Sequence, residues 1–189
     1  METCFNIYMT GVGGQGIGLL AEILARAADY AGLAVRGCDT HGLAQRGGMV
    51  TSHLRLGHSW SPLIPDGGAD LVVALERHEA VRAVDSMLKP GGTMIWYDTS
   101  LQPLDVRMGL VPALDADVIQ QVAEARGIRA IRVYLDDLPD SRMQNIALVS
   151  GILSNELIPG LGKAQVRKAM KDLMTGAVLE ANLEIGRAH

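Results

Sequence analysis

Two glycine-rich stretches constrain the fold of this chain more than any other feature. The first, Gly11–Gly16 with the sequence GVGGQG, follows a short apolar run that begins at Phe5. Apolar residues then recur at helical spacing from Ile17 to Gly32, where a glycine commonly ends a helix. A second strand is expected to start at 33–35. The order strand, glycine turn, helix, strand forms a βαβ unit, which predicts a parallel sheet with a right-handed crossover.

Two later segments carry recognisable turn and cap signals. Met49–Leu56 alternates in character and then reaches Gly57-His58-Ser59, which predicts a hairpin and hence an antiparallel part of the sheet. Ser141 and Gln144 have the spacing of a capping box, which predicts a helix that opens there and runs to about Leu153.

The remaining apolar pattern completes an alternation of strands and helices. We expect a three-layer α/β/α fold whose Rossmann-like sheet is mostly parallel but includes an antiparallel hairpin, as a single domain over residues 1–189. The pattern predicts further strands at 69–75, 93–97 and 131–133, a helix at 80–88 that Lys89–Gly92 ends, a helix near 118–122, and one last helix after Gly162 with an apolar face that reaches Ala177.

Composition excludes several classes of protein. The net charge is −4 and no basic run occurs, which disfavours nucleic acid as a partner because phosphate binding needs clustered cations. The two cysteines, Cys4 and Cys38, are too few and too far apart to hold an iron–sulfur cluster or a structural zinc. The chain shows neither a signal peptide nor an apolar run long enough to span a membrane. We therefore expect a reduced, cytoplasmic protein.

The first glycine stretch has the spacing G-x-G-x-x-G between a strand and a helix. Glycines let backbone N–H groups approach an anion, and a helix N-terminus favours negative charge. Asp39 lies where a ribose-binding acid would follow in an NAD or FAD site. The same glycines could instead serve only a tight turn and close packing. The extra Gly14 also matches adenylating enzymes of the ubiquitin-activating type, although their catalytic cysteine and CxxC pairs have no convincing counterpart here.

The second glycine stretch is more specific. It spans His41–Gly48 with the sequence HGLAQRGG and is followed by Ser52-His53, Arg55 and the segment Ser61–Pro65. This pattern resembles the gamma-type domain of the 2-oxoacid:ferredoxin oxidoreductases, and its form is most similar to the beta subunit of indolepyruvate ferredoxin oxidoreductase. The resemblance covers nearly the whole chain, and it includes the first glycine stretch.

The resemblance implies a subunit of a larger enzyme. Enzymes of this family decarboxylate a 2-oxoacid oxidatively on thiamine diphosphate with Mg²⁺, pass electrons through 4Fe–4S clusters to ferredoxin, and transfer the acyl group to coenzyme A (CoA). This chain lacks the cysteines and the thiamine diphosphate motif, so those cofactors are expected mainly on a larger partner subunit. The chain alone is expected to be inactive, and it could form a homodimer. The alternative is an independent NAD(P)- or FAD-binding oxidoreductase.

The candidate site residues lie in the two stretches. Arg46 offers a planar fork of donors for a carboxylate or phosphate, and Gln45 supplies an orienting amide. His41 and His53 could exchange protons near neutral pH, or be structural like many hydrogen-bonded histidines. Arg46 could equally pin its loop or dock the partner. His58 and His78 are expected to be exposed. The predicted catalytic residues are His41, Gln45 and Arg46, and the predicted cofactor-binding residues are Gly11, Gly13, Gly14, Gln15, Gly16, Gly47 and Gly48. These cofactor-binding residues could hold CoA, part of the thiamine cofactor, or no ligand.

Overall fold

The computed structural model describes residues 4–41, 48–100, 108–110, 112, 114–138 and 140–186. Its centre is a six-stranded sheet in the order β2-β3-β1-β4-β5-β6. The strands β1, β4, β5 and β6 pair in parallel, whereas β3 is antiparallel to both of its neighbours, β1 and β2. The strands are β1 Phe5–Val12, β2 Val35–His41, β3 Met49–Leu56, β4 Ala69–Ala74, β5 Leu88–Tyr97 and β6 Arg129–Val133.

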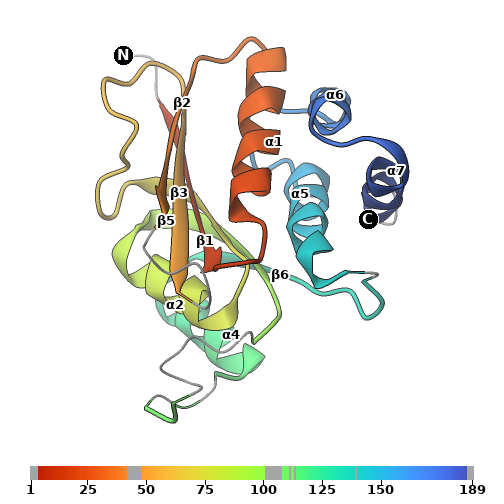
Figure 1. The fold of residues 1–189 in the computed structure, drawn as a ribbon. Helices are drawn as coiled ribbons and strands as arrows, with labels where there is room; N and C mark the ends of the chain where they lie inside the picture. The colour runs from red at the N-terminus through yellow and green to blue at the C-terminus, as the bar shows by residue number, and fades with distance from the viewer. Residues whose placement is uncertain are drawn as a thin grey trace.

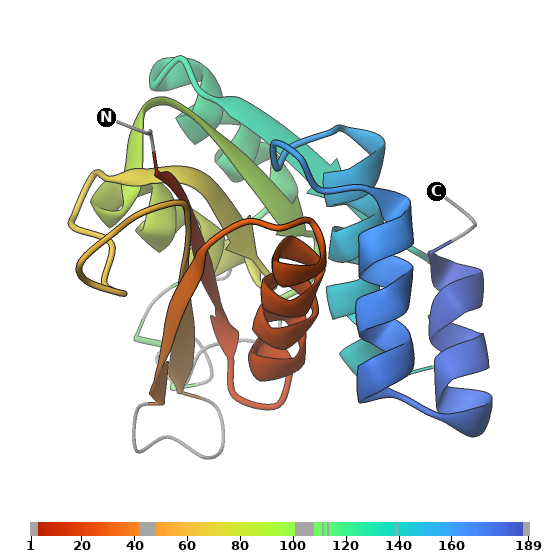
Figure 2. The ribbon, with the colours of Figure 1, turned by 90° about the horizontal axis from the view of Figure 1, so that it is seen from above.

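Helices cover both faces of the sheet and complete the three predicted layers (Figure 1). One layer contains α1, α5, α6 and α7, which lie side by side in Figure 2, and the other contains α2 and α4. Within the described ranges, no helix has the length and apolar character needed to cross a membrane. The helices are α1 Ile17–Tyr30, α2 Arg77–Ser86, α4 Ala116–Ala125, α5 Gln144–Ser154, α6 Lys163–Leu173 and α7 Gly176–Ile185, with the 3₁₀ turn η1 Ser141–Met143 before α5.

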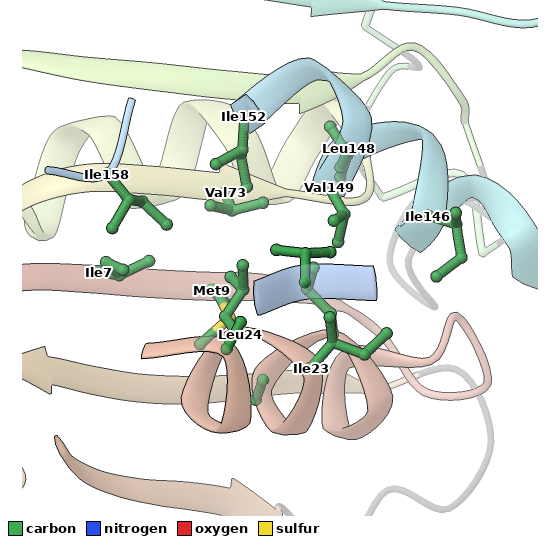
Figure 3. Packing of buried hydrophobic residues seen from close by; sticks show 14 of the residues in the cluster. Ile7, Met9, Ile23, Leu24, Val73, Ile146, Leu148, Val149, Ile152 and Ile158 are labelled. Carbon is green, nitrogen blue, oxygen red and sulfur yellow. The ribbon is translucent and has the colours of Figure 1, made fainter. Parts of the chain in front are cut away.

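Alternation along the central strands divides the apolar core in two. On β1, Ile7 and Met9 face the α1 layer, whereas Tyr8 faces the α2 layer. The other inner strands follow the same two-residue period, so each face of the sheet packs against its own helices. Figure 3 shows the larger cluster, in which Ile23 and Leu24 of α1 lie among side chains of the sheet and of α5.

The antiparallel hairpin is present, but its turn was predicted in the wrong place. Met49–Leu56 does form a strand, and it pairs with β2 on one side and β1 on the other. The hairpin therefore connects β2 to β3 through residues 42–48, and Gly57–Ser59 instead leads toward β4. The predicted βαβ unit is also modified, because β1 and β2 run in the same direction but β3 lies between them.

Three element boundaries differ from the expected ones. Lys89–Gly92 does not end a helix but belongs to β5, where the pairing with β4 shifts register. Asp140, rather than a Ser141 capping box, caps the start of η1, because its side chain accepts a hydrogen bond from Arg142 N–H at 2.8 Å. The last predicted helix is two helices, since the backbone becomes extended at Met174 and Thr175.

Candidate functional site

The carboxyl edge of the sheet carries the first glycine loop. β1 and β4 are parallel neighbours whose carboxyl ends lie at this edge. The helix after β1 covers one face of the sheet, whereas the helix after β4 covers the other (Figure 1). Open α/β sheets bind ligands at such a topological switch point. The fold therefore places Gly11–Gly16 where a ligand site is expected.

The buried side chain of Gln15 bridges the ends of β1 and β4 at this switch point. Its Oε1 accepts a hydrogen bond from Val12 N–H at 2.6 Å, and its Nε2 donates one to the Leu75 carbonyl at 2.5 Å. Gln15 is buried, and its amide thus joins the end of β1 to the residue that follows β4. This structural role adds to the predicted contact of Gln15 with a cofactor, which stays a prediction.

Two glycines of the loop are required by its geometry. A Cβ at Gly11 would lie 2.8 Å from Gln15 Oε1 and 3.0 Å from Leu75 Cβ, so a side chain there would push the bridging amide away. Gly16 has φ of +82°, a left-handed conformation that disfavours other residues, and a Cβ there would lie 2.7 Å from Asn145 Nδ2. The loop is therefore tightly packed against α5 and β4.

The outer side of the loop has the features of an anion site. Gly16 is the N-cap of α1, and it provides no side-chain cap; the first turn of the helix has no acidic residue. A Cβ at the exposed Gly14 would meet no atom within 4 Å. An uncapped helix start with open space beside it favours an anion such as a phosphate.

The two glycine-rich stretches adjoin each other. Gly13 N–H donates a hydrogen bond of 2.9 Å to the carbonyl of Gly48. This bond places the end of the second stretch directly beside the first loop. Gln45, Arg46 and Gly47 lie outside the described residues, and of His41 the structure gives the backbone, paired with Val50 at the end of β2.

A buried acid organises the edge next to β4. Glu76 is fully buried and caps α2, with Oε2 accepting hydrogen bonds from His78 N–H at 2.7 Å and Glu79 N–H at 3.1 Å. Its Oε1 lies 3.0 Å from His78 Nδ1, and His78 Nε2 lies 3.3 Å from the Pro112 carbonyl. The prediction that His78 is exposed was therefore wrong, because the ring is held between a buried carboxylate and a carbonyl.

Glu79 is a second buried carboxyl at this edge. Thr10 Oγ1 donates to Glu79 Oε2 at 3.5 Å, and Arg82 Nη1 lies 3.2 Å from Oε1. Burial raises the pKa of Glu79 above its ordinary value, against the opposing effect of the Arg82 guanidinium. This carboxyl therefore holds a proton more readily than a surface glutamate does.

Asp98 follows β5 and pairs with two cations. Arg77 Nε lies 2.5 Å and Arg132 Nε 2.7 Å from its two oxygens, and the aspartate is buried. Arg77 Nη1 also donates to the Leu114 carbonyl at 3.0 Å. The pairing fixes the starts of α2 and α4 against the ends of β5 and β6.

Comparison with known proteins shows the family of the chain. A family model described as pyruvate ferredoxin/flavodoxin oxidoreductase matches residues 6–188. The chain belongs to this family. An indolepyruvate oxidoreductase subunit IorB from Archaeoglobus fulgidus is 36% identical over 185 residues, which cover 95% of this chain and 90% of that one. The IorB subunit from Methanothermobacter thermautotrophicus is 32% identical over 97% of this chain and 94% of its own length.

Solved structures of the family have the same fold. The pyruvate oxidoreductase subunit PORC from Thermotoga maritima superposes with a TM-score of 0.66 at 20% identity, covering 99% of this chain and 95% of that chain. The 2-oxoglutarate:ferredoxin oxidoreductase from Magnetococcus marinus superposes with a TM-score of 0.73 at 20% identity. That match covers 100% of this chain but 31% of the Magnetococcus chain, so the fold also occurs as part of a longer polypeptide.

Asp39 does not lie where the ribose-binding acid of a dinucleotide site lies. In a dinucleotide site the acid ends the strand beside β1. Here β3 is inserted beside β1, and Asp39 lies on β2, two strands from the glycine loop and opposite Ser52. The alternative of an independent NAD(P)- or FAD-binding oxidoreductase is therefore not favoured.

His53 has a structural environment in this chain. Its Nδ1 accepts a hydrogen bond from Ile64 N–H at 3.1 Å, and its ring meets Tyr8 edge-on at a centroid distance of 5.1 Å. Burial lowers the pKa of His53 below its ordinary value, which favours the neutral ring that can accept this bond. Of the two histidines singled out from the sequence, His53 thus braces the segment after β3.

The residues of this chain suit some cofactors of the family better than others. A 4Fe–4S cluster needs four thiolates, whereas Cys4 lies before β1 and Cys38 within β2. Among the residues that the structure describes, no group of three or more His, Cys, Asp or Glu could hold a metal ion. The two cysteines therefore do not fit an iron–sulfur cluster, whereas the uncapped start of α1 has the open space and the charge preference that suit a diphosphate.

Sequence reasoning missed the ion pairs of Asp98 and the internal role of Gln15. Asp98 and Arg132 are 34 residues apart, and Gln15 and Leu75 are 60 apart. Each residue follows or lies on a different strand, so the pairings appear only once the strand order is known. A short buried strand followed by Asp or Glu, as at Asp98 and Glu76, was the available signal.

Proposed function

We propose that this chain is the small, gamma-type subunit of a 2-oxoacid:ferredoxin oxidoreductase of the indolepyruvate type. The similarity to IorB subunits over nearly the whole length of both chains carries the proposal. The complex would decarboxylate an arylpyruvate oxidatively and transfer the acyl group to CoA, with ferredoxin as electron acceptor. The chain would form one gamma-type domain over residues 1–189 in a cytoplasmic complex.

The positions of the two cysteines, one before β1 and one within β2, support a division of labour, because a 4Fe–4S cluster needs four thiolates. Thiamine diphosphate supplies the carbanion chemistry when it is bound in the complex. The larger partner subunit would hold it, together with Mg²⁺ and the iron–sulfur clusters. This chain would contribute the edge formed by its two glycine stretches, which Gly13 and Gly48 join.

The glycine loop would bind a diphosphate at the open start of α1. CoA and thiamine diphosphate both carry this group, and unpaired helix N–H groups favour its charge. Arg46 would add a bidentate contact to a phosphate or substrate carboxylate, with Gln45 and His41 orienting the same group. In this proposal the chain binds and orients, and it leaves bond breaking to the partner's cofactor.

An exposed tryptophan on a braced segment supports docking to the partner. Trp60 is fully exposed, at 101%, although the backbone around it is fixed. Arg55 Nη1 donates to the carbonyls of Ser61 and Leu63, both at 3.1 Å, and His53 holds Ile64. Tryptophan is enriched among residues that dominate protein interfaces, and a pre-ordered backbone lowers the entropy cost of binding.

Co-purification tests the proposal. The chain isolated from its native extract should bring a stoichiometric larger subunit that carries thiamine diphosphate and iron–sulfur absorbance. The complex should oxidise indolepyruvate in a CoA- and ferredoxin-dependent reaction, and the isolated chain should not. A colourless homo-oligomer with bound nucleotide and no partner would contradict the proposal.

Trp60→Ala tests the docking surface separately. We expect it to weaken assembly with the partner by about 30-fold, which corresponds to about 2 kcal/mol for an interface hot spot. Val178→Ala removes another exposed apolar side chain, on α7, and should leave assembly unchanged. Equal affinity of both variants, measured by interferometry with the purified partner, would exclude Trp60 from the interface.

A further inference from the structure

A cavity of about 140 Å³ lies between α5, α6 and α7, apart from the open start of α1. Its walls are mostly apolar and include Ile146, Val149, Val166 and Leu183. Figure 2 shows the three helices side by side at the margin of the molecule, and Figure 3 shows Ile146 and Val149 on α5. A cavity of about 150 Å³ in another protein accommodates benzene, so this one has room for a single aromatic ring.

One buried polar residue lies on the wall of this cavity. Ser150 lines the cavity and is 96% buried, since its exposed fraction is 4%. A hydroxyl can both donate and accept a hydrogen bond, so this wall position offers a polar contact to a ligand among the apolar side chains.

Two cations lie at the same cavity. Lys163 and Arg167 are one helical turn apart on α6, both line the cavity, and both are exposed. Neither forms an ion pair with another described residue. An apolar cavity with a few convergent polar groups is typical of a small-molecule site, and the charge of these groups selects an anion.

We propose that this cavity binds a small carboxylic acid whose apolar body is about the size of a benzene ring. The ring would lie among the apolar walls, and the carboxylate would accept hydrogen bonds from Arg167, Lys163 and the Ser150 hydroxyl. An inorganic phosphate would leave the apolar walls without contacts, and a neutral ring would not use the cations. The proposal rests on the cavity alone and does not depend on the proposed enzymatic function.

Helix α5 connects the proposed binding site to the carboxyl edge of the sheet. Ile146 follows Asn145, whose Nδ2 donates to the Gly16 carbonyl at 3.3 Å. A ligand that packs against α5 therefore restrains the helix that touches the glycine loop.

Titration of the full-length chain with phenylacetate tests the site. We expect saturable binding by calorimetry, a rise in melting temperature, and at least 10-fold weaker binding of benzyl alcohol, which lacks the charge. Arg167→Gln should weaken phenylacetate binding about 10-fold, and Ser150→Ala about 3-fold, in line with a charged and a neutral hydrogen bond. Lys171→Gln, which removes an exposed cation of α6 away from the cavity, is the matched control and should bind as the unaltered chain does.

Four outcomes would overturn the proposal. They are absence of saturable binding, equal affinity for benzyl alcohol, equal affinity for inorganic phosphate, and affinity unaffected by both Arg167→Gln and Ser150→Ala. Arg167 is exposed, so its variant should keep the fold, which circular dichroism verifies. Loss of phenylacetate binding in that folded variant, with Lys171→Gln unchanged, would support the site even if Ser150→Ala were unstable.

Discussion

Replacement of Gln15 by alanine should destabilise the chain through two buried backbone groups. In the native chain the amide pairs with Val12 N–H and with the Leu75 carbonyl, and Gln15 is 2% exposed. A buried group that loses its partner costs about 1–3 kcal/mol, so two such groups cost about 2–6 kcal/mol. A mid-range loss of about 4 kcal/mol lowers the melting temperature of a domain of this size by about 8–16 °C.

Urea unfolding followed by circular dichroism measures this loss. Gln121→Ala is the matched control, because Gln121 is exposed on α4 and its removal should change the free energy of unfolding by less than about 0.5 kcal/mol. Equal midpoints for Gln15→Ala and Gln121→Ala would refute the structural role of the amide. Gln15 would then act only toward a ligand, as its place in the glycine stretch suggests.

Gln15→Glu makes the hydrogen bond to the Leu75 carbonyl depend on pH, whereas the bond from Val12 N–H can form at any pH. A protonated glutamic acid can accept from Val12 N–H and donate to the Leu75 carbonyl, whereas the carboxylate loses the donor and faces a carbonyl oxygen. The folded state should therefore raise the pKa of this carboxyl. A raised pKa means that the native state binds more protons, so stability should fall as pH rises above the unfolded pKa of about 4.3.

Substitutions at three further sites, the start of α1, His53 and Arg46, test other parts of the chain. Gly16→Ala should lower the free energy of unfolding by at least about 1–2 kcal/mol, because of the left-handed backbone and the contact with Asn145. Gly18→Ala, in the open first turn of α1, should raise it by about 0.5–1 kcal/mol. The midpoints of denaturant unfolding compare the two variants. Because burial lowers the pKa of His53, its contribution to stability is complete above the unfolded pKa and is lost as pH falls through the folded one. His53→Asn keeps an acceptor but cannot titrate, so its stability should vary less between pH 7.5 and 5.5, and equal slopes would contradict this. Arg46→Ala should lower the activity of the assembled complex without preventing assembly, and Arg46→Lys should restore it in part; unchanged activity in an intact complex would exclude a role in binding.

Local patterns were sufficient to predict most of the elements. The apolar period from Ile17 onward predicted α1, and the run 69–75 predicted β4, because each signal lies within one element. The hairpin was predicted correctly as antiparallel but was given the wrong turn. The alternation in Met49–Leu56 identifies a strand, yet it does not say which neighbouring loop makes the hairpin, since pairing with β1 and β2 involves distant residues.

The sequence predicted a candidate site in the two glycine stretches, but not the contacts around them. The structure places Gly13 and Gly48 side by side through a hydrogen bond, and the binding role of these stretches stays a prediction. The burial of His78 and the cap formed by Asp140 depend on packing and on competition among nearby polar side chains, which spacing alone does not resolve. Residues 42–47, which hold the predicted Gln45 and Arg46, lie outside the described part, so their roles stay predictions.

The position of β3 between β1 and β2 has a consequence for how the chain folds during synthesis. β1 emerges first, but its partners β3 and β4 begin 44 and 64 residues after Phe5, at Met49 and Ala69. The helices that cover the same face as α1 come last, from Gln144 onward. An incomplete chain therefore exposes apolar sheet for most of its synthesis, and high contact order slows the closure of such sheets. We expect newly made chains to depend on chaperones until α5 and α6 have emerged.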